Sequence, residues 1–160
     1  MRVIYYCYGS AHSSILAAAI HLGKLPMNRV PDYTEILKLD DFDIARDDSL
    51  GHIFYKGQDD KGHEVYTLGM GPETHIVKRS LLSMIEHSSV PMNQFIFAQA
   101  LPQLHPIGKV GGALSRRYGF EKIGRFLAAK GACYTYFEMV QFVKDTKQKI
   151  AQTMKSLEEC

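Results

Sequence analysis

Residues 3–20 have the sequence Val3-Ile4-Tyr5-Tyr6-Cys7-Tyr8-Gly9-Ser10-Ala11-His12-Ser13-Ser14-Ile15-Leu16-Ala17-Ala18-Ala19-Ile20. The β-branched and aromatic residues at the start of this stretch predict a buried strand. A turn of small residues that contains Gly9 comes next, and apolar residues then recur at helical spacing from Ile15 onward. A strand, a tight loop and a helix in this order direct free backbone amides at one point, where the helix dipole favours a negative charge. The segment therefore predicts an anion-binding loop.

Composition indicates one soluble globular domain. The chain has 160 residues, of which 46% are hydrophobic and 22% charged, which is ordinary for such domains. It contains no apolar run of about 18 residues that would span a membrane and no signal peptide. Its three cysteines are widely spaced and odd in number, which fits neither a zinc pattern nor a disulfide framework. We therefore expect a cytoplasmic protein without a membrane partner.

Charge is unevenly distributed although the net charge is only +2. Residues 32–64 are rich in Asp and Glu, whereas residues 109–130 carry six basic residues and one acidic residue. The two segments could line opposite sides of one molecule, or they could be two ordinary solvated faces. The basic segment contains no nucleic-acid recognition motif and few aromatic residues, so nucleic acid is not expected as a partner.

The rest of the chain alternates between strand and helix patterns. A hairpin is expected from strands at 52–57 and 64–69 with a short Asp- and Gly-containing connector, in which Asp59 and Asp60 are turn residues. A further strand is expected at 94–100, and helices at 31–39, 72–85, 110–118 and 136–157. Residues 124–130 fit either a strand or a helical turn. We favour a strand, because Gly131 and a clear helix follow.

This order predicts an α/β fold. We expect a three-layer sandwich with a mostly parallel sheet of about five strands, one antiparallel edge hairpin strand, and helices on both faces. Residues 1–145 would form the domain and residues 146–160 a helical extension, which is also a candidate homodimer contact. The loops 7–14, 69–73, 99–106 and 130–134 would gather at the carboxyl edge of the sheet, where sites form in such folds.

The opening loop supplies the candidate anion-binding residues Gly9, Ser10, Ser13 and Ser14. Gly9 permits a tight turn. The serine hydroxyls could donate hydrogen bonds to an oxyanion, or could simply cap the helix. The pattern of the lysine-bearing phosphate loop is absent.

Two residues of the same loop are candidate catalytic groups. Cys7 would be an activated nucleophile if it lay exposed at the helix N-terminus, but it could equally be an ordinary buried strand residue. His12 could act as a general base or donate to a phosphate, or could have no special role.

The basic segment supplies further candidates for phosphate recognition, Arg116, Arg117 and Arg125. Arginine binds phosphate through two parallel hydrogen bonds. The alternative is a solvated basic helix face. The remaining histidines show no metal-ligand spacing, so neither a metal site nor a cofactor is expected.

The segment Cys7-Tyr8-Gly9-Ser10-Ala11-His12-Ser13-Ser14 resembles the phosphate loop of low-molecular-weight protein tyrosine phosphatases. The resemblance implies that Cys7 matches the nucleophile, Gly9 the turn glycine and Ser14 the family's serine. Ser13 stands where that family has the arginine that binds the phosphoryl oxygens. The chain also shows no later Asp-Pro general acid. The resemblance thus implies the shape of the loop better than it implies an activity.

A second resemblance covers nearly the whole chain. The opening Tyr-Gly-Ser-Ala-His-Ser-Ser, the later Gly-His-Glu-Val-Tyr-Thr-Leu-Gly and the late Gly-Gly-Ala-Leu-Ser-Arg-Arg-Tyr-Gly are similar to the uncharacterised bacterial domain-of-unknown-function family 3189. This resemblance implies a single bacterial cytoplasmic domain and no particular mechanism.

Two functions remain open from the sequence. In the first, the loop holds the phosphate of a nucleotide or small phosphorylated metabolite, and the protein is a phosphatase-like or phosphoryl-transfer hydrolase. In the second, the protein is a non-catalytic module that binds such a ligand for regulation or interacts with another protein. The expected partner is a phosphate-bearing small molecule or nucleotide, except where the module acts only through contacts with another protein.

Overall fold

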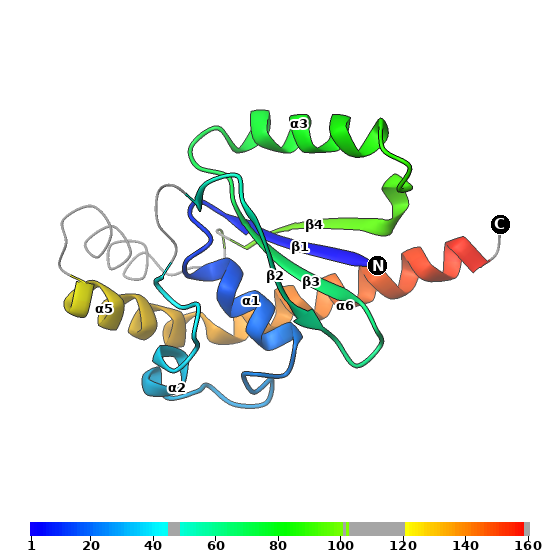
Figure 1. Ribbon diagram of the computed structural model, residues 1–160. Helices are drawn as coiled ribbons and strands as arrows, with labels where there is room; N and C mark the ends of the chain where they lie inside the picture. The colour runs from blue at the N-terminus through cyan, green and yellow to red at the C-terminus, as the bar shows by residue number, and fades with distance from the viewer. Residues whose placement is uncertain (45–48, 101, 103–120, 159–160) are drawn as a thin grey trace.

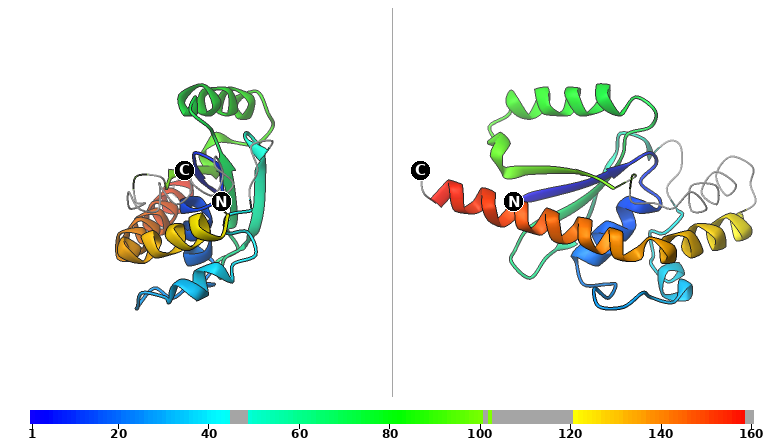
Figure 2. Two further views of the ribbon diagram at one scale, coloured as in Figure 1. Left: turned by 90° about the vertical axis from the view of Figure 1, so that its left-hand side faces the viewer. Right: turned by 180° about the vertical axis from the view of Figure 1, so that it is seen from behind.

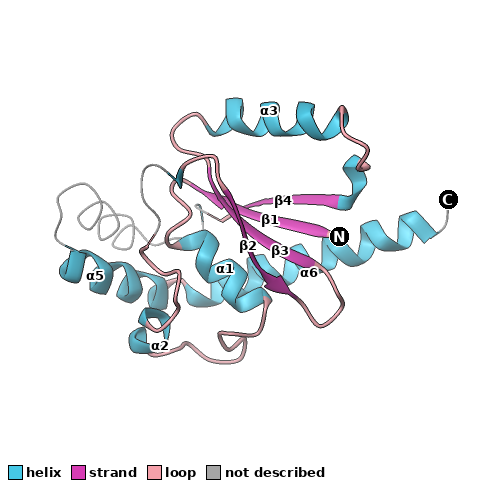
Figure 3. Ribbon diagram, viewed as in Figure 1, coloured by secondary structure: helices cyan, strands magenta, loops and turns pink. Residues whose placement is uncertain are grey.

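A computed structural model describes residues 1–44, 49–100, 102 and 121–158 of the chain. Within them lie four strands, five α-helices and one short 3-10 helix (Figures 1 and 3). In chain order they are β1 (Arg2–Cys7), α1 (Ser13–His21), α2 (Tyr33–Leu37), β2 (Ile53–Gln58), β3 (Glu64–Gly69), α3 (Thr74–Glu86), η2 (Met92–Gln94), β4 (Phe95–Gln99), α5 (Glu121–Tyr134) and α6 (Tyr136–Glu158). The expected helix at 110–118 lies outside the described residues.

The four strands form one mixed sheet in the order β2-β3-β1-β4. β1 pairs in parallel with β3 and with β4, and β2 pairs antiparallel with β3 at the edge of the sheet. The α/β class and the antiparallel hairpin strand at the edge are thus confirmed. The prediction of about five strands is wrong, because the described chain contributes four.

The missing strand is the one expected at 124–130, which belongs to helix α5. Its buried residues are spaced as on one face of a helix: Gly124, Ala128, Ala129, Gly131 and Ala132. Because Gly131 lies inside α5, it does not end a strand. The segment 130–134 is therefore helical and does not add a loop to the carboxyl edge of the sheet.

The side chains of β1 alternate between two hydrophobic clusters. Val3 and Tyr5 pack with α1 and α6 in the larger cluster, whereas Ile4 and Tyr6 pack with Leu68 and residues of α3 in the smaller one. Figure 2 shows α3 on one side of the sheet and α1 with α6 on the other. This alternation is the two-residue period of a strand that is buried on both faces.

Two features of the helices follow local sequence signals. α2 begins with a capping box, in which the Asp32 side chain accepts from the Thr34 amide and the Glu35 side chain accepts from the Asp32 amide. α6 runs unbroken to Glu158, and Ile150 is buried in the larger cluster. The division at residues 145 and 146 remains a prediction.

Candidate functional site

The loop that follows β1 lies at the centre of the sheet's carboxyl edge (Figure 1). β3 pairs with one side of β1 and β4 with the other, so the chain reverses its direction of travel across the sheet at β1. In open α/β sheets, ligands bind at such a switch point, outside the carboxyl ends of the strands. The topology therefore places residues 8–12 where a site would be expected.

The end of β3 packs directly against this loop. A Cβ atom on Gly69 would lie 3.0 Å from the carbonyl carbon of Gly9 and 3.2 Å from the amide nitrogen of Ser10. Two hydrogen bonds also fix the start of the loop, from the Met70 amide to Cys7 O at 3.0 Å and from the Gly71 amide to Tyr8 O at 2.8 Å. Glycine at position 69 thus permits the close approach of the two backbones.

The backbone amides of the loop have no carbonyl partner within the part of the chain that the structure describes. Ser10 has a φ of +51°, a left-handed conformation that is uncommon for a residue with a side chain. Among the described residues, no carbonyl accepts a hydrogen bond from the amides of Ser10 to Ile15, and the first amide to donate is that of Leu16, to His12 O at 2.9 Å. His12 is the N-cap residue of α1, and its side chain makes no capping hydrogen bond.

Two serine hydroxyls of this segment are buried. Ser10 and Ser13 are 2% and 1% exposed, and neither Oγ atom has a hydrogen-bond partner among the described residues. The hydroxyl of Thr67 on β3 is likewise buried and has no hydrogen-bond partner among the described residues. An unpartnered buried hydroxyl costs about 1–3 kcal/mol, so such groups are rare in folded proteins without a reason.

Cys7 and Ser14 form a side-chain pair that joins the end of β1 to the first turn of α1. The Sγ atom of Cys7 lies 3.2 Å from Oγ of Ser14. Cys7 is buried at the last position of β1. In this structure, therefore, it is not the exposed thiol that a catalytic nucleophile must be.

His12 is oriented by a carboxylate from a distant part of the chain. Its Nε2 atom lies 2.7 Å from Oδ1 of Asp43, whose side chain is 2% exposed. The Asp43 amide in turn donates to Ala11 O at 2.9 Å, which fixes this segment against the loop. With Nε2–H directed at the carboxylate, Nδ1 is the ring nitrogen left for a proton transfer or a ligand.

A second histidine network is centred on His21, the last residue of α1. Nδ1 of His21 is 2.8 Å from the Tyr5 hydroxyl, and its Nε2 is 3.0 Å from Oδ2 of Asp59. A neutral ring protonated on Nε2 satisfies both contacts, since it donates to Asp59 and accepts from Tyr5. Burial lowers the pKa of His21, and the Asp59 hydrogen bond opposes this shift only in part. Asp59 also accepts hydrogen bonds from the backbone amides of Lys61 and His63. Its carboxylate therefore links the β2–β3 turn to α1.

The predicted arginine cluster lies elsewhere or outside the described residues. Arg125 is on α5, and its Nη2 atom donates to Leu37 O of α2 at 3.0 Å. Its contact is thus with α2, and the structure does not bring it to the loop. Arg116 and Arg117 lie outside the described residues, and their assignment to the anion site remains a prediction.

Within the described ranges, no group of three or more His, Cys, Asp or Glu side chains could hold a metal ion. No helix in the same ranges is both long and apolar enough to cross a membrane.

The family model described as "Protein of unknown function (DUF3189)" matches residues 2–148. The chain belongs to the DUF3189 family. No curated protein and no solved structure matches it significantly. The family-wide similarity noted in the sequence is thereby confirmed, whereas the resemblance of this DUF3189 loop to a phosphatase phosphate loop remains a prediction.

Sequence analysis missed the partners of both buried histidines in this DUF3189 protein. Asp43 lies 31 residues from His12 and Asp59 lies 38 residues from His21. Asp59 had a local signal as a turn residue, which it is. Neither pairing has a sequence signal, because each depends on how the chain packs in three dimensions.

Proposed function

We propose that residues 9–14 bind the phosphate group of a nucleotide or another small phosphorylated molecule. The observation that carries this proposal is a combination of donors without a partner among the described residues: the backbone amides from Ser10 to Ile15 and the buried hydroxyls of Ser10 and Ser13. Amides at a helix N-terminus and small hydroxyl side chains are the usual ligands of a phosphate in α/β proteins. A bound phosphate would accept from both sets of donors at once.

The energetics favour an oxyanion over an uncharged ligand. Each unpartnered buried hydroxyl destabilises the free protein by about 1–3 kcal/mol, and hydrogen bonds to a charged acceptor stabilise by about 1.5–3 kcal/mol. The dipole of α1 adds an attraction of about 0.3–1 kcal/mol for a negative group at its N-terminus. Phosphate binding would thus offset the desolvation cost of the buried hydroxyls in the unliganded protein.

Isothermal titration calorimetry with inorganic phosphate and with AMP tests this binding. We expect both to bind the wild-type protein, and we expect Ser13→Ala to weaken phosphate binding by about tenfold, because it removes one hydrogen bond to a charged acceptor. Ser80→Ala, on the exposed surface of α3, is the matched control and should bind as wild type does. No heat of binding and no thermal stabilisation by either ligand would contradict the proposal.

A second candidate, a phosphomonoester hydrolase, is favoured by the His12–Asp43 pair. It requires that ligand binding expose the Cys7 thiol, which is buried in the structure described above. The Cys7 thiolate would attack phosphorus and form an S–P bond as the P–O ester bond breaks, while protonated His12 gives its proton to the leaving oxygen. Neutral His12 would then take a proton from water, which attacks the phosphocysteine and releases inorganic phosphate and the thiolate. Asp43 would stabilise the charged ring in the first step.

Hydrolysis of p-nitrophenyl phosphate separates the two candidates. The hydrolase predicts loss of turnover in Cys7→Ser and a roughly hundredfold or greater decrease in His12→Ala. Phosphate binding without turnover in the wild-type protein would instead support a binding module. Equal turnover in the wild type and both variants would exclude the proposed chemistry.

A further inference from the structure

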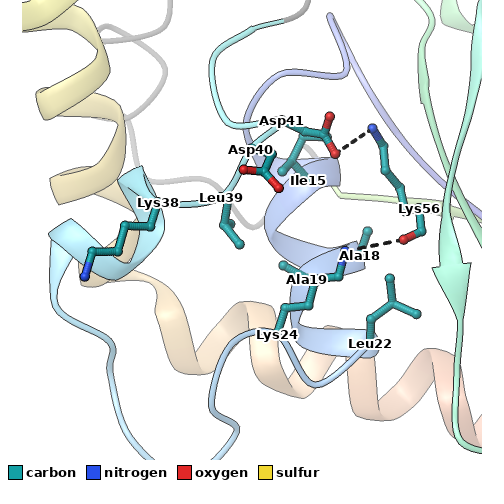
Figure 4. Close-up of a pocket in the computed structure, with 10 residues that line it drawn as sticks. All are labelled: Ile15, Ala18, Ala19, Leu22, Lys24, Lys38, Leu39, Asp40, Asp41 and Lys56. Carbon is teal, nitrogen blue, oxygen red and sulfur yellow. Dashed lines mark hydrogen bonds and ion pairs between the residues drawn. The ribbon is translucent and has the colours of Figure 1, made fainter.

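A cavity of about 240 Å³ lies on the side of α1 that faces α2 and β2 (Figure 4). None of residues 9–14 lines it. This volume exceeds that of an engineered cavity of about 150 Å³ that holds benzene, and it lies below the range of about 300–1,000 Å³ for drug-sized ligands. The cavity is therefore the right size for a small metabolite.

One wall of the cavity is aliphatic. Ile15, Ala18 and Ala19 lie on one face of α1, and the C-cap residue Leu22 continues this face at helical spacing. Leu39 faces them from the chain that follows α2. The two alanines leave room where larger residues would fill the space. Such a wall favours a branched aliphatic group.

The remaining wall carries charges of both signs, on opposite sides. Lys24 and Lys56 lie on the side of β2, where the Lys24 Nζ atom donates to Lys56 O at 3.5 Å. Asp40 and Asp41 lie across from them, and Asp41 Oδ2 is 3.0 Å from Lys56 Nζ. The side chain of Lys38 points away from the others in Figure 4. Apart from Lys38, the charged residues that line the cavity are two lysines and two aspartates, whose charges cancel.

Among the described residues, the carboxylate of Asp40 has no hydrogen bond or ion pair, and Lys24 donates only a long bond to a neutral carbonyl. A ligand could therefore bind an ammonium group to Asp40 and a carboxylate to Lys24 without breaking the Lys56–Asp41 pair. A simple anion would leave Asp40 unpaired beside it, and a simple cation would leave Lys24 unpaired. Charge complementarity therefore selects a zwitterion.

We propose that this cavity binds a small zwitterion with a branched aliphatic side chain, as in a branched-chain α-amino acid. The side chain lies against Ile15, Ala19 and Leu39, the carboxylate accepts from Lys24, and the ammonium group donates to Asp40. The proposal does not depend on the phosphate loop. The two sites share only Ile15, whose side chain lines the cavity and whose backbone amide is the last donor of the loop.

Methyl-detected NMR titration of the full chain with L-leucine tests the site. We expect saturable shifts of the Ile15, Leu22 and Leu39 methyl signals, with intermolecular nuclear Overhauser effects from the leucine methyls to the same residues. Isocaproate lacks the ammonium group and isopentylamine lacks the carboxylate, so each should bind about tenfold more weakly. Glycine lacks the side chain and should also bind more weakly.

Two matched lysine variants make the test specific. Lys24→Met should weaken leucine binding by about tenfold, whereas Lys38→Met, whose ammonium group points away, should leave it unchanged. Both residues are exposed, so neither variant should disturb the fold. The proposal is overturned if leucine causes no saturable shifts, if isocaproate binds as tightly as leucine, or if the Overhauser effects come from residues elsewhere. Equal loss of binding in both lysine variants would also overturn it.

Discussion

Replacing Ser10 with glycine should stabilise the free protein and at the same time impair phosphate binding. Ser10 has a φ of +51° and a buried hydroxyl without a described partner. A side chain in the left-handed region costs about 1–2 kcal/mol, which glycine avoids. Glycine loses about 0.5–1 kcal/mol through the extra freedom of the unfolded chain.

The hydroxyl adds a further contribution of the same sign. Removing a buried, unpartnered hydroxyl relieves about 1–3 kcal/mol of desolvation cost, part of which is lost again as packing contacts disappear. The net expectation is a gain of about 1–2 kcal/mol in the free energy of unfolding. For a chain of this size it corresponds to a rise in Tm of about 2–8 °C.

Thermal and urea denaturation in phosphate-free buffer measure this gain, and calorimetry with phosphate measures the loss of affinity. Ser14→Ala is the matched control, because its hydroxyl is already paired with Cys7 and its removal should destabilise the fold by about 0.5–1.5 kcal/mol. If the Ser10→Gly protein has a free energy of unfolding about 1 kcal/mol or more below that of the wild type, the hydroxyl has a structural partner. The reasoning on the loop would then be refuted.

Three further predictions concern the surroundings of the loop. Gly69→Ala places a Cβ atom 3.0 Å from the carbonyl carbon of Gly9, so we expect a destabilisation of about 1–3 kcal/mol by urea denaturation, together with weaker phosphate binding; wild-type stability would contradict the close packing. Tyr5→Phe leaves Nδ1 of buried His21 without its donor and should cost about 1–3 kcal/mol, whereas a neutral effect would show that the pair is not formed. Because burial lowers the pKa of His21 in the folded state, the unfolded chain binds more protons below about pH 6.5, and the free energy of unfolding should fall from pH 7 to pH 5. Urea midpoints that are constant or higher at pH 5 would contradict this assignment.

Local signals predicted the parts of the fold on which the site depends. The strand, glycine turn and helix of residues 3–20 were predictable because each has its own periodicity and the turn separates them. The hairpin was predictable for the same reason, since Asp59 and Gly62 stand between two β-rich runs. The helix expected at 31–39 likewise contains α2, which begins directly after its N-cap residue Asp32.

The errors have physical causes. Phe126-Leu127-Ala128-Ala129 is a short apolar run, which fits a strand or a helix equally well until its neighbours are known. Tertiary packing decides between them, since the small residues of α5 form one buried face. The pairing of His12 with Asp43 and the charged cavity beside α1 also depend on contacts between distant segments. No spacing rule contains that information.

The most direct test of the central claim is a crystal structure of the protein soaked with tungstate, a phosphate analogue with strong anomalous scattering. We predict an anomalous peak at the N-terminus of α1, within hydrogen-bond distance of the Ser10 and Ser13 hydroxyls and of the amides between Ser10 and Ile15. If the protein's own atoms fill the space inside the loop, and no tungstate binds at the N-terminus of α1 at saturating concentration, the claim is contradicted.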